Sequence, residues 1–206
     1  MSTASLNSAV ERLRREAEHA ESLSILEILN IFESLGPSVA AILLALPFLQ
    51  PLPLIGLSTP LGITIALSGA AIALDRPIWL PSRFSRTLIS SAIILKKIAV
   101  LEGLTAKLGG FFQHSDEPPQ PLTNSTRRWL GVNIIVHGLL LALPLPVPFS
   151  NTVPAWTCGA AAMTVIFPSA KGLWLTNGLI FVNLVFWSAA VGAAAFAIPT
   201  LVETWQ

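Results

Sequence analysis

His137 and Asn133 are the polar side chains that stand out inside the apolar stretches of this sequence. They are four residues apart, so a helix would bring both to one face. Polar groups at membrane depth must find partners, and they often line the path of a solute. A hydrogen bond between two helices explains the pair at least as well. We therefore treat both as candidate ligand-binding residues with a structural alternative.

Further polar residues lie in two proline-rich stretches, ALPFLQPLPLIGLSTP at 45–60 and ALPLPVPFSNTVP at 142–154. They could bind a ligand beside the ends of broken helices, whose dipoles attract ions. They could equally cap the helices that restart after each turn, with Thr59 directly before Pro60 at the first helical position. We expect capping, with ligand binding as an added hypothesis. The candidates are Gln50, Ser58, Thr59, Ser150 and Asn151.

The sequence does not predict an enzyme. No carboxylate lies within an apolar helix, which leaves no acid–base pair for sugar chemistry. There is no GxSxG motif, no P-loop and no cluster of metal ligands, and Cys158 is the single cysteine. We therefore expect neither a metal nor a cofactor. Only His137 could serve a proton-coupled carrier.

The composition is typical of a membrane protein. Of 206 residues, 53% are hydrophobic and 11% are charged, and the mean hydropathy is +0.70. A soluble domain usually has about a quarter charged residues. These values predict an all-α, polytopic membrane protein in contact with the lipid bilayer. The net charge of +1 provides no basic field for nucleic acid.

The two proline-rich stretches predict helical hairpins. Each proline removes an N–H donor and restricts the residue before it, so a helix must stop and restart. The flanking helices expected are 37–49 and 60–74, then 129–143 and 153–167. The first two would each cover roughly 20 Å of a hydrocarbon core of about 30 Å. Each hairpin is thus either re-entrant or a pair of tight crossings. The prolines expected to be structural are Pro47, Pro51, Pro53, Pro60, Pro144, Pro146, Pro148 and Pro154.

The hairpins resemble each other and predict an internal repeat. Ala45 aligns with Ala142 at an offset of 97, and Pro51 aligns with Pro146 at an offset of 95. Two Leu- and Pro-rich stretches could converge by composition, but proline spacing and helix lengths both match. With the flanks of both hairpins in the cytoplasm, 11 of the 12 Lys and Arg residues obey the positive-inside rule. This count favours a cytoplasmic N-terminus and repeats that enter from one face.

The N-terminal region predicts amphipathic helices. Residues 8–20 are charge-rich, with Val10, Leu13 and Ala17 on one stripe. Ser24 and Glu27 have the spacing of a capping box, and the helix that follows would end at 36–37.

The later segments predict a surface helix, a linker and a full membrane span. Lysines interrupt residues 88–112, which favours a helix on the membrane surface, whereas 173–198 carry no charge and are long enough to span. The expected domains are amphipathic helices at 1–36, a first repeat at 37–112, a proline-rich linker at 113–128 and a second repeat at 129–206.

Four motifs carry a resemblance to a known family: LSILEILNIFESLG at 23–36, ALPFLQPLPLIGLSTPLG at 45–62, DRPIWLP at 75–81 and ALPLPVPFSNTVPAW at 142–156. The sequence resembles the ExoD family of bacterial membrane proteins over most of residues 23–200. It departs from the family where an acidic turn is common and this chain has Pro168–Gly172. The resemblance implies a bacterial inner-membrane protein linked to exopolysaccharide production, without a known mechanism or substrate.

Two hypotheses of function follow. The first is a small transport or permeation protein that carries a small solute or ion past the two proline-rich turns. It would be a homodimer, because about five apolar segments are few for an enclosed path. The alternative is an accessory subunit without catalytic activity, which would scaffold a polysaccharide synthesis or export complex through its surface helices.

Overall fold

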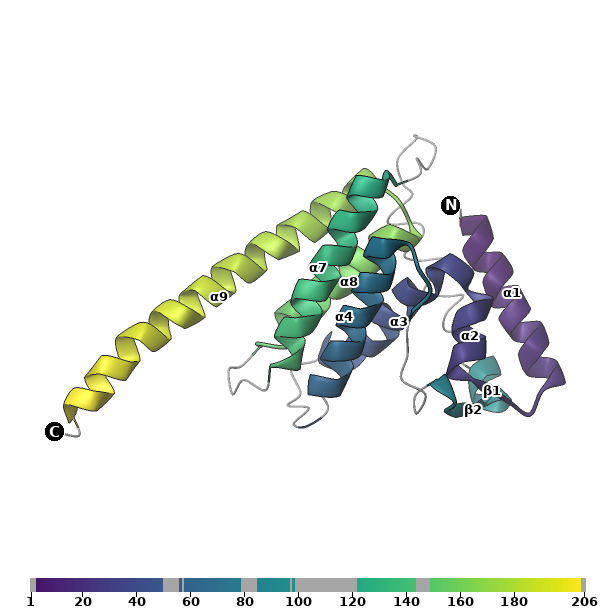
Figure 1. The fold of residues 1–206 in the computed structure, drawn as a ribbon, viewed down its shortest axis with the longest axis horizontal. Helices are drawn as coiled ribbons and strands as arrows, with labels where there is room; N and C mark the ends of the chain where they lie inside the picture. The colour runs from purple at the N-terminus through teal and green to yellow at the C-terminus, as the bar shows by residue number, and fades with distance from the viewer. Residues whose placement is uncertain are drawn as a thin grey trace.

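The computed structural model describes residues 3–49, 56, 58–78, 85–96, 98, 122–143 and 149–204. Their fold is all-helical except for one short pair of antiparallel strands (Figure 1). The elements are, in order, α1 (Thr3–His19), β1 (Ser22–Ser24), α2 (Ile25–Ile31), the 3-10 helix η1 (Glu33–Leu35), α3 (Gly36–Ala45), the 3-10 helix η2 (Leu46–Leu49), α4 (Ser58–Leu74), β2 (Leu88–Ser90), α7 (Asn124–Ala142), α8 (Thr152–Ile166) and α9 (Ala170–Thr204).

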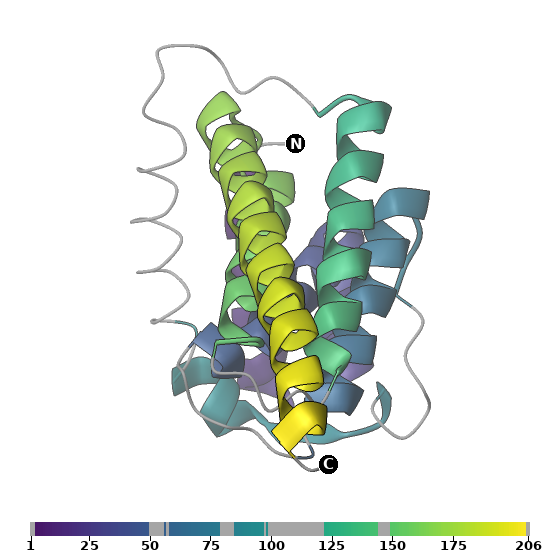
Figure 2. The same cartoon turned by 90° about the vertical axis from the view of Figure 1, so that its left-hand side faces the viewer.

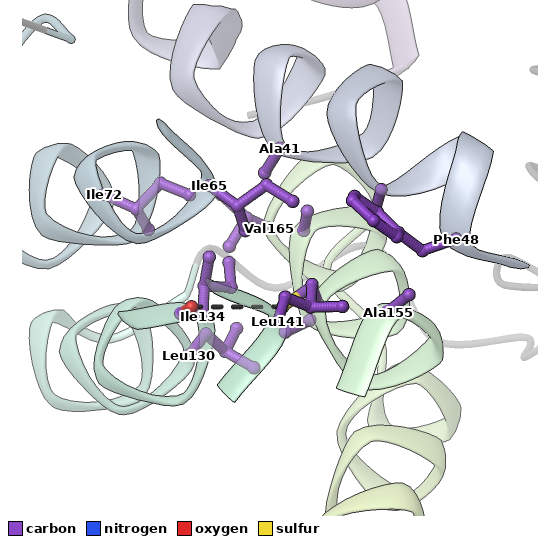
Figure 3. Packing of buried hydrophobic residues seen from close by; sticks show 13 residues of the cluster. Ala41, Phe48, Ile65, Ile72, Leu130, Ile134, Leu141, Ala155 and Val165 are labelled. Atoms are coloured by element: carbon purple, nitrogen blue, oxygen red, sulfur yellow. Dashed lines mark hydrogen bonds between the residues drawn. The ribbon is translucent and has the colours of Figure 1, made fainter. Parts of the chain in front are cut away.

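Helices α3, α4, α7 and α8 form a four-helix bundle. Ile65 of α4, Ile134 of α7 and Ala161 of α8 are fully buried in its core, and Figure 3 shows side chains of all four helices meeting there. The Cys158 thiol lies 3.9 Å from the carbonyl oxygen of Ile134 and joins α8 to α7. The helix ends that flank the two proline-rich turns lie at the same end of the bundle, the lower end in Figures 1 and 2.

Glycines bring α4 and α7 into backbone contact. A Cβ atom added to Gly62 would lie 2.6 Å from the carbonyl oxygen of Gly138, and one added to Gly69 would lie 2.7 Å from that of Gly131. Each helix therefore places two glycines, seven residues apart, against the other helix. These pairs also show that α4 and α7 are antiparallel. Small residues at such spacing allow helices to pack closely without a large apolar side chain between them.

The N-terminal segments form a layer that packs on one side of the bundle, against residues of α3 and α8. Val10, Leu13 and Ala17 are buried in a second apolar cluster, which confirms the predicted stripe on α1. The predicted capping box is also confirmed, because Glu27 N–H donates to Ser24 Oγ at 3.2 Å and Ser24 N–H donates to the Glu27 carboxylate at 2.7 Å.

Several predicted boundaries were wrong. Gly36 begins α3 instead of ending the preceding helix, and α3 tightens into a 3-10 helix from Leu46, one residue before Pro47. Residues 88–90, predicted as the start of a surface helix, form β2, in which Ile89 pairs with Leu23 of β1. Helix α7 begins at Asn124, inside the predicted linker, because the Thr123 side chain caps it.

Helix α9 is the one described helix long and apolar enough to cross a membrane by itself, over Ala170–Ala193. Only 11% of its most apolar window is buried, and its C-terminal part extends away from the bundle (Figures 1 and 2). The segments Ile25–Ile31 and Glu33–Leu49 together have the length of a span but are bent by 116°. Helices α4 and α8 are apolar but shorter.

Candidate functional site

The Thr59 side chain connects the regions of the two proline-rich turns. Its hydroxyl donates a hydrogen bond of 2.9 Å to the carbonyl oxygen of Ala142, the last residue of α7. Thr59 lies inside α4, which begins at Ser58, so the prediction that it caps this helix was wrong. Because Ala142 directly precedes the second turn, this bond brings the start of α4 next to that turn.

The other turn residues differ in their surroundings. Ser58 and Ser150 are both 3% exposed. Asn151 occupies the position before α8, but its side chain makes no capping hydrogen bond, and its buried Oδ1 has no partner among the described residues. Capping by this side chain was therefore predicted wrongly. Gln50 lies outside the described residues.

The described prolines lie where helices begin or end. Pro60 and Pro154 are each the third residue of a helix, where the missing N–H would have no partner within that helix. Pro47 lies in η2, directly after α3. The other predicted structural prolines, Pro51, Pro53, Pro144, Pro146 and Pro148, lie outside the described residues.

His137 and Asn133 are buried and bonded within their own helix. His137 Nδ1 lies 2.7 Å from the carbonyl oxygen of Asn133, and Asn133 Nδ2 donates to the carbonyl oxygen of Trp129 at 2.8 Å. They share a face of α7, as the spacing predicted. These bonds join successive turns of α7, so they are not the bonds between helices that were the alternative.

Polar side chains also follow the line where α8 packs on α9. The hydroxyl groups of Thr164 and Thr176 lie 3.3 Å apart, and both residues are fully buried. Two turns further along, Asn183 Nδ2 donates to Thr157 Oγ1 at 2.6 Å and to the carbonyl oxygen of Val153 at 3.2 Å. Asn183 therefore lies against the first turns of α8, next to the second proline-rich turn.

Three buried polar atoms in this region have no hydrogen-bond partner among the described residues: Asn151 Oδ1, Asn183 Oδ1 and Trp187 Nε1. An unpaired buried polar atom costs about 1–3 kcal/mol, so each of these atoms would gain from contact with water or a ligand. Among the described residues, the side chains of Ser38, Ser91 and Arg127 also have such an atom, so the three atoms alone do not define a binding site.

Asn183 and Trp187 were not among the residues predicted to bind. A signal for Asn183 is nevertheless present in the sequence. Asn183 follows Thr176 by seven residues in an apolar helix, and Thr157 precedes Thr164 by seven in another. Such a spacing puts two polar groups on the same stripe of a helix. The sequence alone does not reveal that the two stripes face each other.

A second polar site lies between α1 and α2, away from the turns. It is a partly open cavity of about 520 Å³ with charges of both signs. Its lining residues are Arg12, Arg15, Glu16, Leu23, Glu27, Asn30 and Ile31. Two of these charges already have partners, since Arg12 pairs with Glu33 at 2.7 Å and Glu27 completes the capping box.

These features define a class of all-helical protein with a small bundle and a long apolar helix that the bundle covers only in part. Comparison with known sequences identifies the family within this class. Residues 6–195 match the model of the family described as "Exopolysaccharide synthesis, ExoD". The chain belongs to the ExoD family, as its motifs predicted.

Two relatives show how far the similarity extends. The chain is 32% identical over 163 residues to Protein ExoD of Rhizobium meliloti, which covers 75% of this chain and 64% of that protein. It is 26% identical over 183 residues to an uncharacterized protein of Synechocystis sp., covering 85% of this chain and 78% of that one. The first alignment thus spans less than two thirds of the Rhizobium protein. No solved structure matches the chain.

Proposed function

We propose that this ExoD-family protein is an integral membrane protein that serves exopolysaccharide synthesis by moving a small solute or ion across the bilayer. The path would pass the polar groups at the bundle end where the two proline-rich turns lie. The protein would sit in the bacterial inner membrane with several crossings, a cytoplasmic N-terminus and a homodimeric assembly.

The observation that carries the membrane placement is the apolar outer surface of the bundle. Helix α7 and the residue that caps its C-terminus, Leu143, expose four large apolar side chains at successive turns, while the opposite face of α7 forms part of the core. A helix that is apolar on both faces is typical of a membrane environment, because water would disfavour its outer face. The exposed residues are Val132, Val136, Leu139 and Leu143, each 46–53% exposed.

The support for transport is the position of polar groups at the turn end. The bond from Thr59 to Ala142 joins the two turn regions, and Asn151 has an unpaired amide oxygen nearby in sequence, after the second turn. Backbone that is not helical is tolerated at membrane depth where it is enclosed by protein or lines a water-filled cavity. A path beside the two stretches that the prolines predict to be turns would meet this requirement.

The test is a flux assay with purified protein in liposomes. We expect a protein-dependent flux of at least one small solute or ion, altered by Asn151→Ala and by His137→Ala. Asn177→Ala is the control, because Asn177 is an exposed asparagine of α9 bonded to Trp129 at 3.3 Å. Flux equal to that of empty liposomes across neutral solutes, protons and common ions would reject transport.

The α1–α2 layer favours the second function, an accessory subunit. This layer shares an apolar cluster with α3 and α8, and it carries a partly open cavity with charges of both signs, to which a partner could dock. Under this function, pulldown from membranes would recover a stable complex with the polysaccharide machinery. Arg15→Glu on the cavity wall would then weaken the complex without changing the fold of the bundle.

A further inference from the structure

Close packing of α4 on α7 sets the position of two arginines at the bundle end opposite the proline-rich turns. A Cβ atom added to Gly131 of α7 would lie 2.6 Å from the amide nitrogen of Ala73 in α4. Arg76 follows Ala73 by three residues, and Arg128 precedes Gly131 by three. Because the helices are antiparallel, both arginines lie about one turn beyond this contact, at the same level. The end of α4 and the start of α7 form the upper end of the bundle in Figure 1.

The two arginines are exposed and form no ion pair among the described residues. The acidic residue beside them, Asp75, already pairs with Arg127 at 2.6 Å. Helices α4, α7 and α8 contain no acidic residue, and α9 contains only Glu203, near its far end. Two positive side chains at one level on neighbouring helices repel each other, and an anion bound by both would remove this repulsion.

The outer face of α7 continues from Arg128 as an apolar stripe. Val132 and Val136 follow Arg128 by four and eight residues, which puts the three along one side of the helix. The two valines are 46% and 48% exposed. Beside Arg128, the half-exposed indole of Trp129 donates to Asn177 Oδ1 of α9 at 3.3 Å. Tryptophan rings are enriched at the level of lipid headgroups. This surface therefore combines positive charge at one end with apolar side chains along its length.

We propose that this surface binds an anionic phospholipid, with its phosphate between Arg76 and Arg128 and an acyl chain along Val132 and Val136. Guanidinium groups bind phosphate oxygens with parallel N–H donors, so two arginines suit one phosphate. Their charge opposes the ammonium group of a zwitterionic headgroup, whereas an anionic headgroup adds no cation. A free phosphate would leave the apolar stripe unused. The inference rests on the membrane placement in the proposed function, and it does not require transport.

The experiment measures lipids bound to the full-length protein by native mass spectrometry from detergent micelles. The probes are phosphatidylglycerol and phosphatidylcholine with identical acyl chains. We expect phosphatidylglycerol to bind at least about tenfold more tightly. Glycerol phosphate, which has the same phosphate without a chain, should not displace it. Equal affinity for the two lipids would overturn the proposal. Displacement by glycerol phosphate at comparable concentration would also overturn it, because the site would then bind free phosphate esters.

The double variant Arg76→Gln, Arg128→Gln tests the position of the site. We expect its preference for phosphatidylglycerol to fall to about twofold or less, with an unchanged Tm in phosphatidylcholine because both side chains are exposed. The control Arg15→Gln, Arg86→Gln removes the same charge from exposed arginines outside the bundle and should keep the preference. Should the double variant fail to fold, Arg128→Gln alone still decides. A preference that survives in the tested variant, or that falls equally in the control, contradicts the site.

This proposal and the proposed function fail in different ways. A preference for phosphatidylglycerol without any flux in liposomes would keep the lipid site and reject transport. Flux in liposomes, with equal affinity for the two lipids, would keep transport and reject the site. Release of the protein from membranes by alkaline carbonate would reject the membrane placement itself.

Discussion

Asp75 has a left-handed backbone with a φ of 53°, a conformation that usually requires glycine. It lies directly after α4, where the N–H of Arg76 closes the helix by bonding to the carbonyl oxygen of Ala71 at 2.9 Å. The Asp75 carboxylate pairs with Arg127 of α7 at 2.6 Å. The aspartate therefore keeps a strained backbone that glycine would relieve, and in return it ties the end of α4 to the start of α7.

Substitution of Asp75 separates these two effects. Asp75→Gly removes the ion pair but relieves the backbone, whereas Asp75→Ala removes the ion pair and keeps the strain. We expect Asp75→Ala to be less stable than Asp75→Gly by about 1 kcal/mol. The measurement is unfolding in denaturant followed by circular dichroism. Equal stability of the two variants would show that the φ of this residue carries no cost.

The capping box formed by Glu27 should make the stability of the N-terminal layer depend on pH. Hydrogen bonds from the Ser24 N–H and then from its hydroxyl lower the pKa of the Glu27 carboxyl below its usual value. A lowered pKa means that the stabilisation is complete above the unfolded-state pKa and is lost as the pH falls through the folded-state pKa. The effect is small, because the group is exposed.

The matched variants for this prediction are Glu27→Gln and Glu18→Gln, the latter an exposed glutamate of α1. We expect the Tm difference between the wild type and Glu27→Gln to shrink as the pH is lowered from neutral to below about 4. Glu18→Gln should show no such trend. A difference for Glu27→Gln that stays constant with pH would contradict the charged form of the capping box.

At the scale of elements, backbone contact between α4 and α7 makes glycine necessary at particular positions. A Cβ on Gly69 would lie 2.7 Å both from the carbonyl oxygen of Gly131 and from the amide nitrogen of Ile135. Neither atom can move without shifting a helix. Gly159 of α8 differs, because a Cβ there would meet nothing within 4 Å.

Alanine at these two glycines should therefore have opposite effects. Gly69→Ala should destabilise the bundle by about 1–3 kcal/mol, the usual cost of an overpacked interior. Gly159→Ala should be neutral or stabilising by about 0.5–1 kcal/mol, because alanine favours a helix. Thermal unfolding in one detergent compares them directly. A stable Gly69→Ala protein would mean that α4 and α7 separate easily.

The apolar helices were predictable from the sequence, and the contacts between them were not. Proline positions and apolar runs gave α4 and α8 to within two residues at each end, because both signals are local. The strand β2 was missed, since three residues such as 88–90 have too little pattern to predict a strand. Asn183 was not predicted as a candidate, because its proximity to Val153 depends on how α8 meets α9.

At the scale of the whole molecule, helix lengths bear on whether the hairpins cross the membrane. Helix α4 has 17 residues and α8 has 15, or about 25 and 22 Å at 1.5 Å per residue. The 35 residues of α9 give about 52 Å. Against a hydrocarbon core of about 30 Å, α9 is long enough to span it, and each hairpin either reaches mid-depth or crosses where the membrane is thin.

Labelling of single cysteines from each side of the membrane distinguishes these arrangements. The background is Cys158→Ala, which removes the one cysteine, a buried one. Asp75→Cys and Lys171→Cys report on the bundle end opposite the turns, and Glu203→Cys reports on the far end of α9. We expect an impermeant maleimide to label the first two from one side and Glu203→Cys from the other. All three labelled from one side would reject the span by α9.

Phe149→Cys then decides the depth of the second hairpin, because Phe149 is 56% exposed and lies at the turn end. In a fully crossing hairpin it should be labelled from the same side as Glu203→Cys. In a re-entrant hairpin it should resist the impermeant reagent from both sides, yet react with a small permeant one if a water-filled path reaches the turn. Only the permeant pattern agrees with a solute path that passes a turn held at mid-depth. Labelling from the side of Lys171→Cys would place the turns on that face and contradict both arrangements.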